Sequence, residues 1–137
     1  MKLIKAMQEI TDSVETTLTS AGLLDGLSLT AEEIKAATTP IYWFVYVKSS
    51  DASEKQNYLV WNYQLIGSLN GDGEKLVYPF EVTITFYSRN KIVDTYLENI
   101  ENAFISAFYT IDLSAVDYDT NRMMYSYKFV VRAQVSE

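Results

Sequence analysis

The chain of 137 residues contains no cysteine and no histidine, and only two prolines. Without cysteine it has no disulfide, thiol nucleophile or thiolate metal ligand. Without histidine, the Ser-His and Cys-His dyads of nucleophilic catalysis are excluded. Only serine-lysine or paired-carboxylate chemistry is left, and no spacing in the sequence indicates either. We therefore expect a protein that is not an enzyme and that has no cofactor or metal.

Charge and composition limit the kind of partner and the number of domains. Eleven lysines and arginines against 18 aspartates and glutamates give a formal net charge of −7, which disfavours dedicated binding to nucleic acid or anionic lipid. Hydrophobic residues make up 48% and charged residues 21%, as in globular proteins, so we expect one domain over residues 1–137. Charges interrupt the N-terminal segment "MKLIKAMQEITDSVE" too often for a signal peptide or a membrane span, which predicts a soluble, cytoplasmic chain.

Two segments near the N-terminus have the pattern of helices. In the first, apolar residues recur at spacings of three and four, which predicts an amphipathic helix packed on a core; they are Leu3, Met7, Ile10, Val14 and Leu18. Gly22 is the expected stop of this helix. Thr30, followed three residues later by Glu33, predicts a capping box at the start of a short second helix, and Pro40 sets its far limit.

The period of the pattern then changes to two, which indicates strands. The segment "IYWFVYVK" (41–48) is aromatic and β-branched and predicts a strand, and the polar residues 49–57 predict a loop. Residues 58–69 and 75–88 flank "NGDGE", whose Asn and Gly residues suit a tight turn, so we expect a long hairpin. Pro79 indicates a sheet edge or a bulge. Alternate residues of the second strand form the predicted core face: Phe80, Val82, Ile84 and Phe86.

A second long helix and a closing strand pair are predicted in the last third of the chain. Apolar residues recur every four positions over residues 92–108, namely Ile92, Tyr96, Ile100, Phe104 and Phe108. Two strands with a turn near Thr120 and Asn121 follow, and one face of the last strand carries Tyr125, Tyr127, Phe129, Val131 and Ala133. The order predicts an α+β fold, a mainly antiparallel sheet packed on one face by the N-terminal helix and the helix at about 92–108.

Two short motifs could hold a ligand, but each has a simpler interpretation. "DYDTN" (117–121) resembles the start of a calcium loop, yet Arg122 replaces the glycine and Lys128 the bidentate glutamate of that loop, which favours a plain turn. "GDGEK" lacks the Gly-Lys-Ser/Thr ending of a phosphate loop, which favours a hairpin turn.

The sequence is rich in residues that favour contacts between surfaces. Eleven tyrosines and two tryptophans have an apolar body with a polar group, and such residues are enriched at interfaces. A buried aromatic core is the alternative, because either face of each strand could be the inner one. The candidate interface residues are Tyr42, Trp61, Tyr63, Tyr87, Arg89, Tyr118 and Arg122. "YSYKFVVRA" also invites comparison with RNA-recognition domains, but it lacks their glycines.

Several segments together resemble the tail terminator, or tail completion, family of long-tailed bacteriophages. They are the N-terminal amphipathic helix (2–20), the X-Pro start of an aromatic strand in "TTPIYWFVYV", a hairpin whose second strand is "YPFEVTITFYSRN", the helix "VDTYLENIENAF" and the final strand "YSYKFVVRAQV". In the family a segment like "FEVTITFYSRN" leads directly into such a helix, and it does so here.

The resemblance implies a structural virion protein with no catalytic residues. Such a subunit would form a ring of six copies on the head-proximal end of the tail, end polymerisation of the major tail tube protein and present the docking surface for a neck protein of the head. Double-stranded DNA would pass through the ring without specific binding. We expect residues 49–57 and 70–74 to order only on assembly.

Two other functions remain open from the sequence. The chain could be a head-completion or neck adaptor, or another tail ring protein, because the same pattern would suit those positions in a phage. It could also be a non-viral α+β module that binds a small ligand or a peptide.

Overall fold

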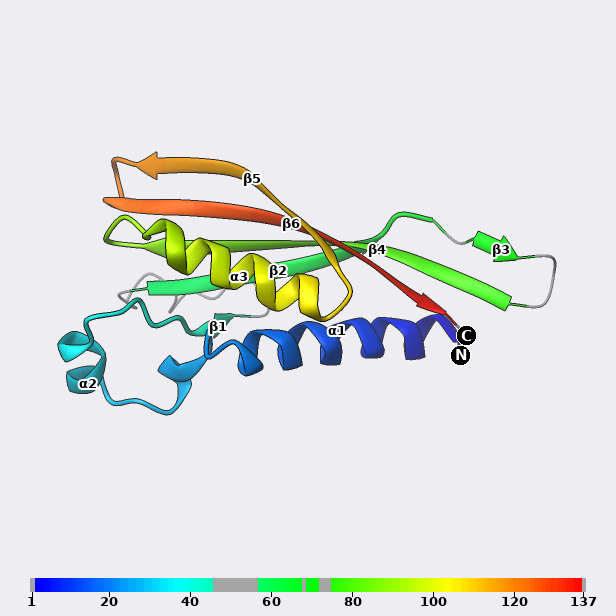
Figure 1. Ribbon diagram of the computed structural model, residues 1–137, viewed down its shortest axis with the longest axis horizontal. Coiled ribbons are helices and arrows are strands. Elements are labelled where there is room, and N and C mark those ends of the chain that lie inside the picture. The colour runs from blue at the N-terminus through cyan, green and yellow to red at the C-terminus, as the bar shows by residue number, and fades with distance from the viewer. Residues whose placement is uncertain (1, 46–56, 68, 72–74, 137) are drawn as a thin grey trace.

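The structure, a computed structural model, describes residues 2–45, 57–67, 69–71 and 75–136 (Figure 1). Helices and strands follow one another in the predicted α+β order. They are α1 (Lys2–Ser20), the 3-10 turn η1 (Asp25–Leu27), α2 (Ala31–Ala36), β1 (Phe44–Val45), β2 (Asn57–Leu65), β3 (Leu69–Gly71), β4 (Lys75–Ser88), α3 (Asp94–Ser106), β5 (Thr110–Asp119) and β6 (Met124–Ser136).

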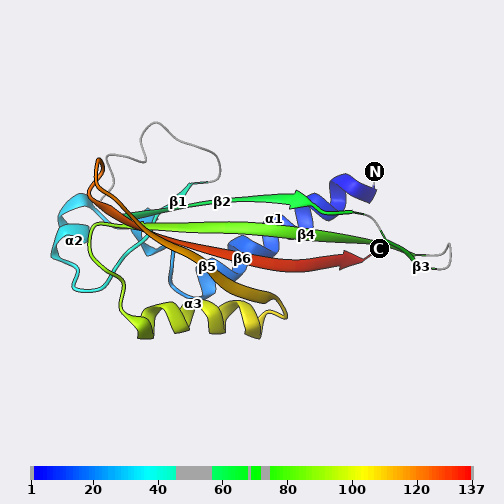
Figure 2. The ribbon, with the colours of Figure 1, turned by 90° about the horizontal axis from the view of Figure 1, so that it is seen from above.

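The sheet has the order β1-β2-β4-β6-β5, and β3 pairs with the far end of β4. Strands β2, β4, β6 and β5 are antiparallel to their neighbours, whereas the short β1 joins β2 in parallel. Helices α1 and α3 lie on the same side of the sheet (Figures 1 and 2). The predicted fold class, an antiparallel sheet with a long hairpin and two helices on one face, is confirmed.

Strand β4 is the centre of the core. Its alternate side chains, which were predicted to face inward, are fully buried; they are Phe80, Val82, Ile84 and Phe86. The register places Ile84 opposite Phe129 of β6 and opposite Trp61 of β2, and all three are fully buried. Burial of such large apolar side chains contributes about 1.5–3 kcal/mol each. The sheet is therefore fixed by one layer of aromatic and branched residues beneath the helices.

Helix α1 packs one stripe on this layer and ends at the predicted glycine. Ile10, Val14 and Leu18 are buried as predicted. The buried residue one turn before Ile10 is Ala6, and Met7 beside it is partly exposed, because the buried stripe follows a spacing of four residues. Gly22 has φ +72°, and the amide of Leu23 donates to the carbonyl of Leu18 (3.0 Å). This is a Schellman stop, which favours glycine because a side chain is strained at positive φ.

The predicted N-cap of α2 at Thr30 is confirmed, but Glu33 bonds the Thr30 hydroxyl in place of the Thr30 amide that a capping box would use. The amide of Glu33 donates to Oγ1 of Thr30 (3.2 Å), and the Thr30 hydroxyl donates to the Glu33 carboxylate (3.1 Å). Helix α2 ends at Ala36, and the segment from Ala37 to Ile41 runs in an irregular path toward the sheet.

The predicted strands around the hairpin differ in their limits. The strand expected at 41–48 begins at Phe44, and residues 46–48 and most of the expected loop 49–57 lie outside the described residues. Most of the expected tip at 70–74 lies outside them as well. Pro79 lies where β2 gives way to β3, and its carbonyl accepts from the amide of Ile66 (2.9 Å). The break in pairing at this point agrees with the expected irregularity.

Candidate functional site

The face of the sheet opposite α1 and α3 is covered by no helix in the described part of the chain (Figure 1). Its side chains are polar or half-buried, and the row across the middle includes the ion pair between Arg132 and Glu81 (3.5 Å). Because both partners of this pair are partly in water, it contributes less than about 1 kcal/mol. The open face is therefore not a second core, except at one end.

At that end, beside the start of β2, a small aromatic cluster lies on the open face. Tyr58 and Met124 are buried there, and Val60 and Tyr87 pack against them. The rings of Tyr58 and Tyr87 stack with centroids 4.7 Å apart. Burial raises the pKa of the Tyr87 phenol, and Tyr58 adds to this effect. Tyr87 is thus half-buried by its own chain, and Tyr58 is a member of the cluster that the sequence did not single out.

Arg89 and Arg122, two of the candidate interface residues, hold the strand ends beside this cluster. Arg122 donates from Nη1 to the Tyr58 hydroxyl (3.3 Å) and pairs with the Asp119 carboxylate (3.7 Å). Arg89 donates from Nη1 to the carbonyl of Arg122 (3.1 Å), and its amide donates to Oδ1 of Asn57 (3.2 Å). Both arginine side chains are exposed, so they connect strands of the same chain and still reach solvent.

The "DYDTN" segment forms a turn, as the simpler interpretation predicted. Oδ1 of Asp119 accepts hydrogen bonds from the amides of Asn121 (2.9 Å) and Arg122 (3.2 Å). A carboxylate that bonds two amides in this way closes an Asx-type turn between β5 and β6. In the described part of the chain, no three acidic, histidine or cysteine side chains are grouped so as to hold a metal ion.

For two of the candidate interface residues, the prediction that they face outward is wrong. Tyr42 and Trp61 are fully buried in the core and do not face outward. The Tyr42 ring lies edge-on to Phe86, with centroids 4.9 Å apart. Tyr63 is half-buried on the same inner face and packs on Phe80, with centroids 5.7 Å apart. For these three residues, the alternative of an aromatic core is the correct one.

Tyr118, by contrast, lies in an exposed apolar part of the edge strand. No described strand pairs with the outer edge of β5, which is the last strand of the sheet. A register shift between Leu113 and Ala115 marks a bulge, after which Val116 and Tyr118 lie on the helix face of the sheet. Val116 is 52% and Tyr118 46% exposed, and the Tyr118 ring packs on Tyr125 (4.7 Å). An unpaired edge of this kind is a place where a further chain can add.

Among the described residues, the most exposed large apolar side chain is at the C-terminal end of α3. Phe108 is 97% exposed, and Ile105 in the last turn is 56% exposed. Phe108 was predicted to continue the buried stripe of the helix, and that prediction is wrong. The amide of Tyr109 donates to the carbonyl of Phe104 (3.0 Å), which ends the helix, and Phe108 has φ +66°. A left-handed backbone costs about 1–2 kcal/mol for a residue with a side chain.

The neighbouring residues fix Phe108 in this position. Tyr109 is buried against Phe104, with ring centroids 5.6 Å apart, and its hydroxyl is hydrogen-bonded to Ser13 of α1. Burial raises the pKa of the Tyr109 phenol. Because Tyr109 is directed inward and tied to α1, the residue before it is directed outward. The strained, exposed position of Phe108 is therefore held by the buried position of Tyr109.

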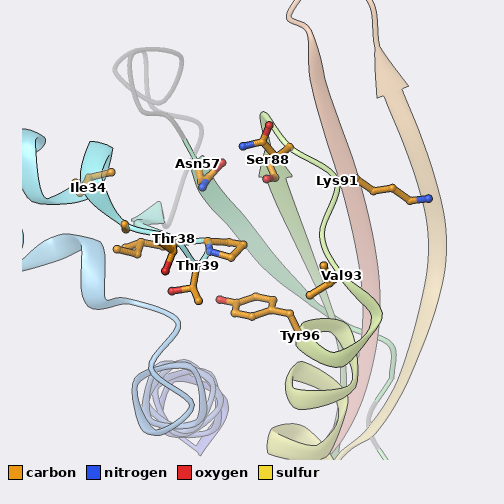
Figure 3. A pocket seen from close by; sticks show the side chains of 12 residues that line it. Ile34, Thr38, Thr39, Asn57, Ser88, Lys91, Val93 and Tyr96 are labelled. Atoms are coloured by element: carbon orange, nitrogen blue, oxygen red, sulfur yellow. The ribbon is translucent and has the colours of Figure 1, made fainter.

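A pocket of about 250 Å³ lies at the opposite, N-terminal end of α3 (Figure 3). The segment after α2, the ends of β2 and β4, and the first turn of α3 enclose it. Its lining consists of Ile34, Ala37, Thr38, Thr39, Pro40, Ile41, Asn57, Ser88, Asn90, Lys91, Val93 and Tyr96. The Tyr96 ring lies along one wall with its hydroxyl toward Thr39, and the Lys91 side chain extends away from the pocket (Figure 3).

Buried hydroxyl groups lie behind this pocket. Ser88 is buried in its lining, and the Tyr42 hydroxyl lies next to Ser88 without a hydrogen bond of good geometry in the described structure. The amide of Ile92 donates to the Tyr127 hydroxyl (3.0 Å). Burial raises the pKa values of Tyr42 and Tyr96 well above their usual range, so these phenols are neutral at physiological pH. The rear of the pocket is uncharged.

The described structure is thus an α+β domain whose helices cover one face of its sheet, with exposed apolar residues at one end of α3 and a pocket at the other. No protein-family model matches the chain, and no curated protein matches its sequence. No helix in the described ranges is long and apolar enough to cross a membrane. The functional assignment depends on the site and on the resemblance described above.

Proposed function

We propose that the chain is a tail terminator of a long-tailed bacteriophage, a structural virion protein that assembles as a ring at the head-proximal end of the tail. The resemblance implies a ring of six copies. Two of the segments that carry the resemblance fall on regular elements: "FEVTITFYSRN" covers the end of β4 and "VDTYLENIENAF" covers most of α3. In this proposal the partners are further copies of the chain, the major tail tube protein and a neck protein of the head.

The observation that carries the proposal is the exposed apolar surface formed by Phe108, Ile105 and the edge strand β5. A side chain that is 97% exposed and held in strained backbone gives no stability to the free subunit. It becomes favourable only when another surface buries it, and aromatic residues are the commonest anchors of such contacts. The unpaired edge of β5 begins two residues after Phe108, so both features belong to one side of the molecule.

The charge of the chain suits a ring through which DNA passes. Six copies at −7 each carry a formal charge of −42. Phosphates gain no counterion-release attraction from an acidic surface, so a duplex would move past it without adhering. The same property disfavours a role that depends on holding nucleic acid.

Mass photometry and negative-stain imaging of the purified full chain test the proposal. We expect closed rings, formed either by the chain alone or on the ends of assembled tail tubes, and shorter tubes when the chain is added during tube growth. A chain that stays monomeric at micromolar concentration and leaves tube length unchanged would count against the proposal.

Two alternatives make different predictions. A head-completion or neck adaptor would also form rings but would bind the portal end of the head and leave tube growth unchanged. The pocket at the start of α3 favours the other alternative, a ligand-binding module, because its size is near the lower limit of small-molecule sites. A metabolite that raises the melting temperature of a strictly monomeric chain would support that function instead.

A further inference from the structure

We infer that Phe108 of one copy inserts into the pocket at the N-terminal end of α3 of the next copy, so that subunits join head to tail. This inference rests on the proposed ring assembly and specifies its contact. Each subunit would supply one inserted side chain, with Ile105 beside it, and one pocket.

The two parts of this contact cannot meet within one chain. Val93 in the pocket lining directly precedes α3, and Phe108 follows the helix by two residues. With a rise of about 1.5 Å per residue, they lie about 20 Å apart at opposite ends of a rigid helix. Figure 2 shows α3 running between these two ends along the side of the sheet. The pocket can therefore receive Phe108 only from another molecule.

The size and lining of the pocket suit a phenyl ring. A cavity of about 150 Å³ is enough to bind benzene, and this pocket has about 250 Å³. About half of the lining is apolar or aromatic surface, supplied by Ile34, Pro40, Ile41 and the Tyr96 ring, and the rest is polar. Val93 at the rim is 64% exposed, and a docking partner would reduce this exposed fraction.

Lys91 at the pocket rim gives one complementary charge, although Asp94 directly follows Val93 and Asp25 lies close enough to act on Tyr96. Helices α1 beyond Lys5 and α3 carry acidic residues and no basic residue; the acidic residues are Glu9, Asp12, Glu15, Asp94, Glu98 and Glu101. Glu101 is one turn before Ile105, at the end that carries Phe108. The lining of the pocket contains one charged residue, Lys91, and no carboxylate. Because the Lys91 side chain extends outward from the rim (Figure 3), it can meet an acidic side chain that flanks the incoming Phe108.

The two parts of the contact lie on different surfaces of the subunit, so the contact is heterologous. A heterologous contact leaves one free Phe108 and one free pocket on every growing chain, and only closure into a ring satisfies both. Stable protein–protein interfaces bury about 1,200 Å² or more, and a single inserted side chain buries far less. The edge of β5, which begins next to Phe108, would supply further contact area.

Two variants of the full-length chain test the inference. Phe108→Asn removes the inserted ring and keeps a residue that tolerates the left-handed backbone, so the fold is retained. Ala37→Trp fills the pocket from an exposed position and leaves Phe108 intact. We expect each variant alone to self-associate about tenfold or more weakly than the wild type. Circular dichroism spectra and melting curves that match the wild type establish that both are folded.

Mixing the two variants separates a head-to-tail contact from a symmetric one. Ala37→Trp has an intact Phe108 and Phe108→Asn has an intact pocket, so we expect an equimolar mixture to give 1:1 dimers by mass photometry, and no rings. No dimers in the mixture, from a chain whose wild type forms rings, would overturn the head-to-tail arrangement.

The other outcomes distinguish this inference from the proposed function. If Phe108→Asn forms rings as well as the wild type does, the inserted residue is wrong while ring assembly stands. If Phe108→Asn forms normal rings but no longer ends tube growth, Phe108 docks on tube protein and the inference is again overturned. If the wild type neither self-associates nor affects tubes, the proposed function fails and the inference fails with it.

Discussion

Two phenylalanines, four residues apart, allow one chemical change to be tested in buried and exposed surroundings. Phe104 is fully buried against Tyr109, whereas Phe108 is almost fully exposed. Replacing a buried Phe by Ala costs about 3–5 kcal/mol, because transfer free energy is lost and a cavity remains. For a chain of this size, that loss lowers the melting temperature by about 10–20 °C. Phe108→Ala deletes the same atoms from a side chain that is already in solvent, so it should change the free energy of unfolding by less than about 0.5 kcal/mol.

Urea denaturation followed by circular dichroism measures both variants, at a protein concentration low enough to keep the chain monomeric. Unfolding should be two-state, with similar m-values for the two variants and the wild type. Equal losses of stability for the two variants would refute the assignment of Phe104 to the core and of Phe108 to the surface. A large loss for Phe108→Ala alone would mean that the helix stripe continues to Phe108, as its spacing suggests.

Three further predictions concern the core around the pocket. Tyr42→Phe should leave stability unchanged or raise it by up to about 1 kcal/mol, because the buried hydroxyl makes no hydrogen bond of good geometry; a loss above 1 kcal/mol in urea denaturation would contradict this. Burial raises the pKa values of the Tyr42 and Tyr96 phenols, so they stay neutral in the folded chain while the unfolded chain ionises above pH about 10. The free energy of unfolding should therefore be unaffected by these groups below that pH and should fall above it; denaturation curves from pH 8 to 11 that show no fall would speak against their burial. Gly26→Ala should cost about 1–3 kcal/mol, since an added Cβ would lie 1.9 Å from Cδ1 of Trp43 and displace that ring; unchanged near-ultraviolet circular dichroism and stability would disprove the close approach.

Elements in which apolar residues recur at a regular spacing could be predicted from the sequence. Residues 80–86 of strand β4 alternate between apolar and polar, and a sheet with one covered face leaves only one orientation for such a strand. Its four predicted inward residues are all buried. The stop at Gly22 and the cap at Thr30 were also predictable, because each depends on a local hydrogen bond that few residue types can make.

Strands that are apolar on both faces could not be oriented in this way. In β2 the segment "NYLVWNYQL" places aromatic residues on each side, so the sequence alone does not decide whether Tyr58 or Trp61 faces the helices. The pairing of Trp61 with Ile84 decides it. That pairing depends on contacts between residues far apart in the chain, which no local pattern contains.

Two backbone irregularities decide the exposure of Phe108, which was predicted to be buried, and of Tyr118, which was among the predicted interface residues. Helix α3 ends at Ser106, and the left-handed turn at Phe108 directs this side chain outward, but no glycine or asparagine marks the position. The bulge between Leu113 and Ala115 exchanges the faces of the rest of β5, which brings Tyr118 to the helix side. A pattern based on regular spacing loses its phase at both points.

The place of β6 in the sheet has a consequence for the order in which the domain can fold. Strand β6 lies between β4 and β5 and pairs Ser136 with Val77, so β2 and β4 are not joined to β5 until β6 has been made. Such long-range pairing folds slowly, typically in milliseconds to seconds. A product truncated before β6 would leave both β4 and β5 without the strand that joins them, so the sheet would not form.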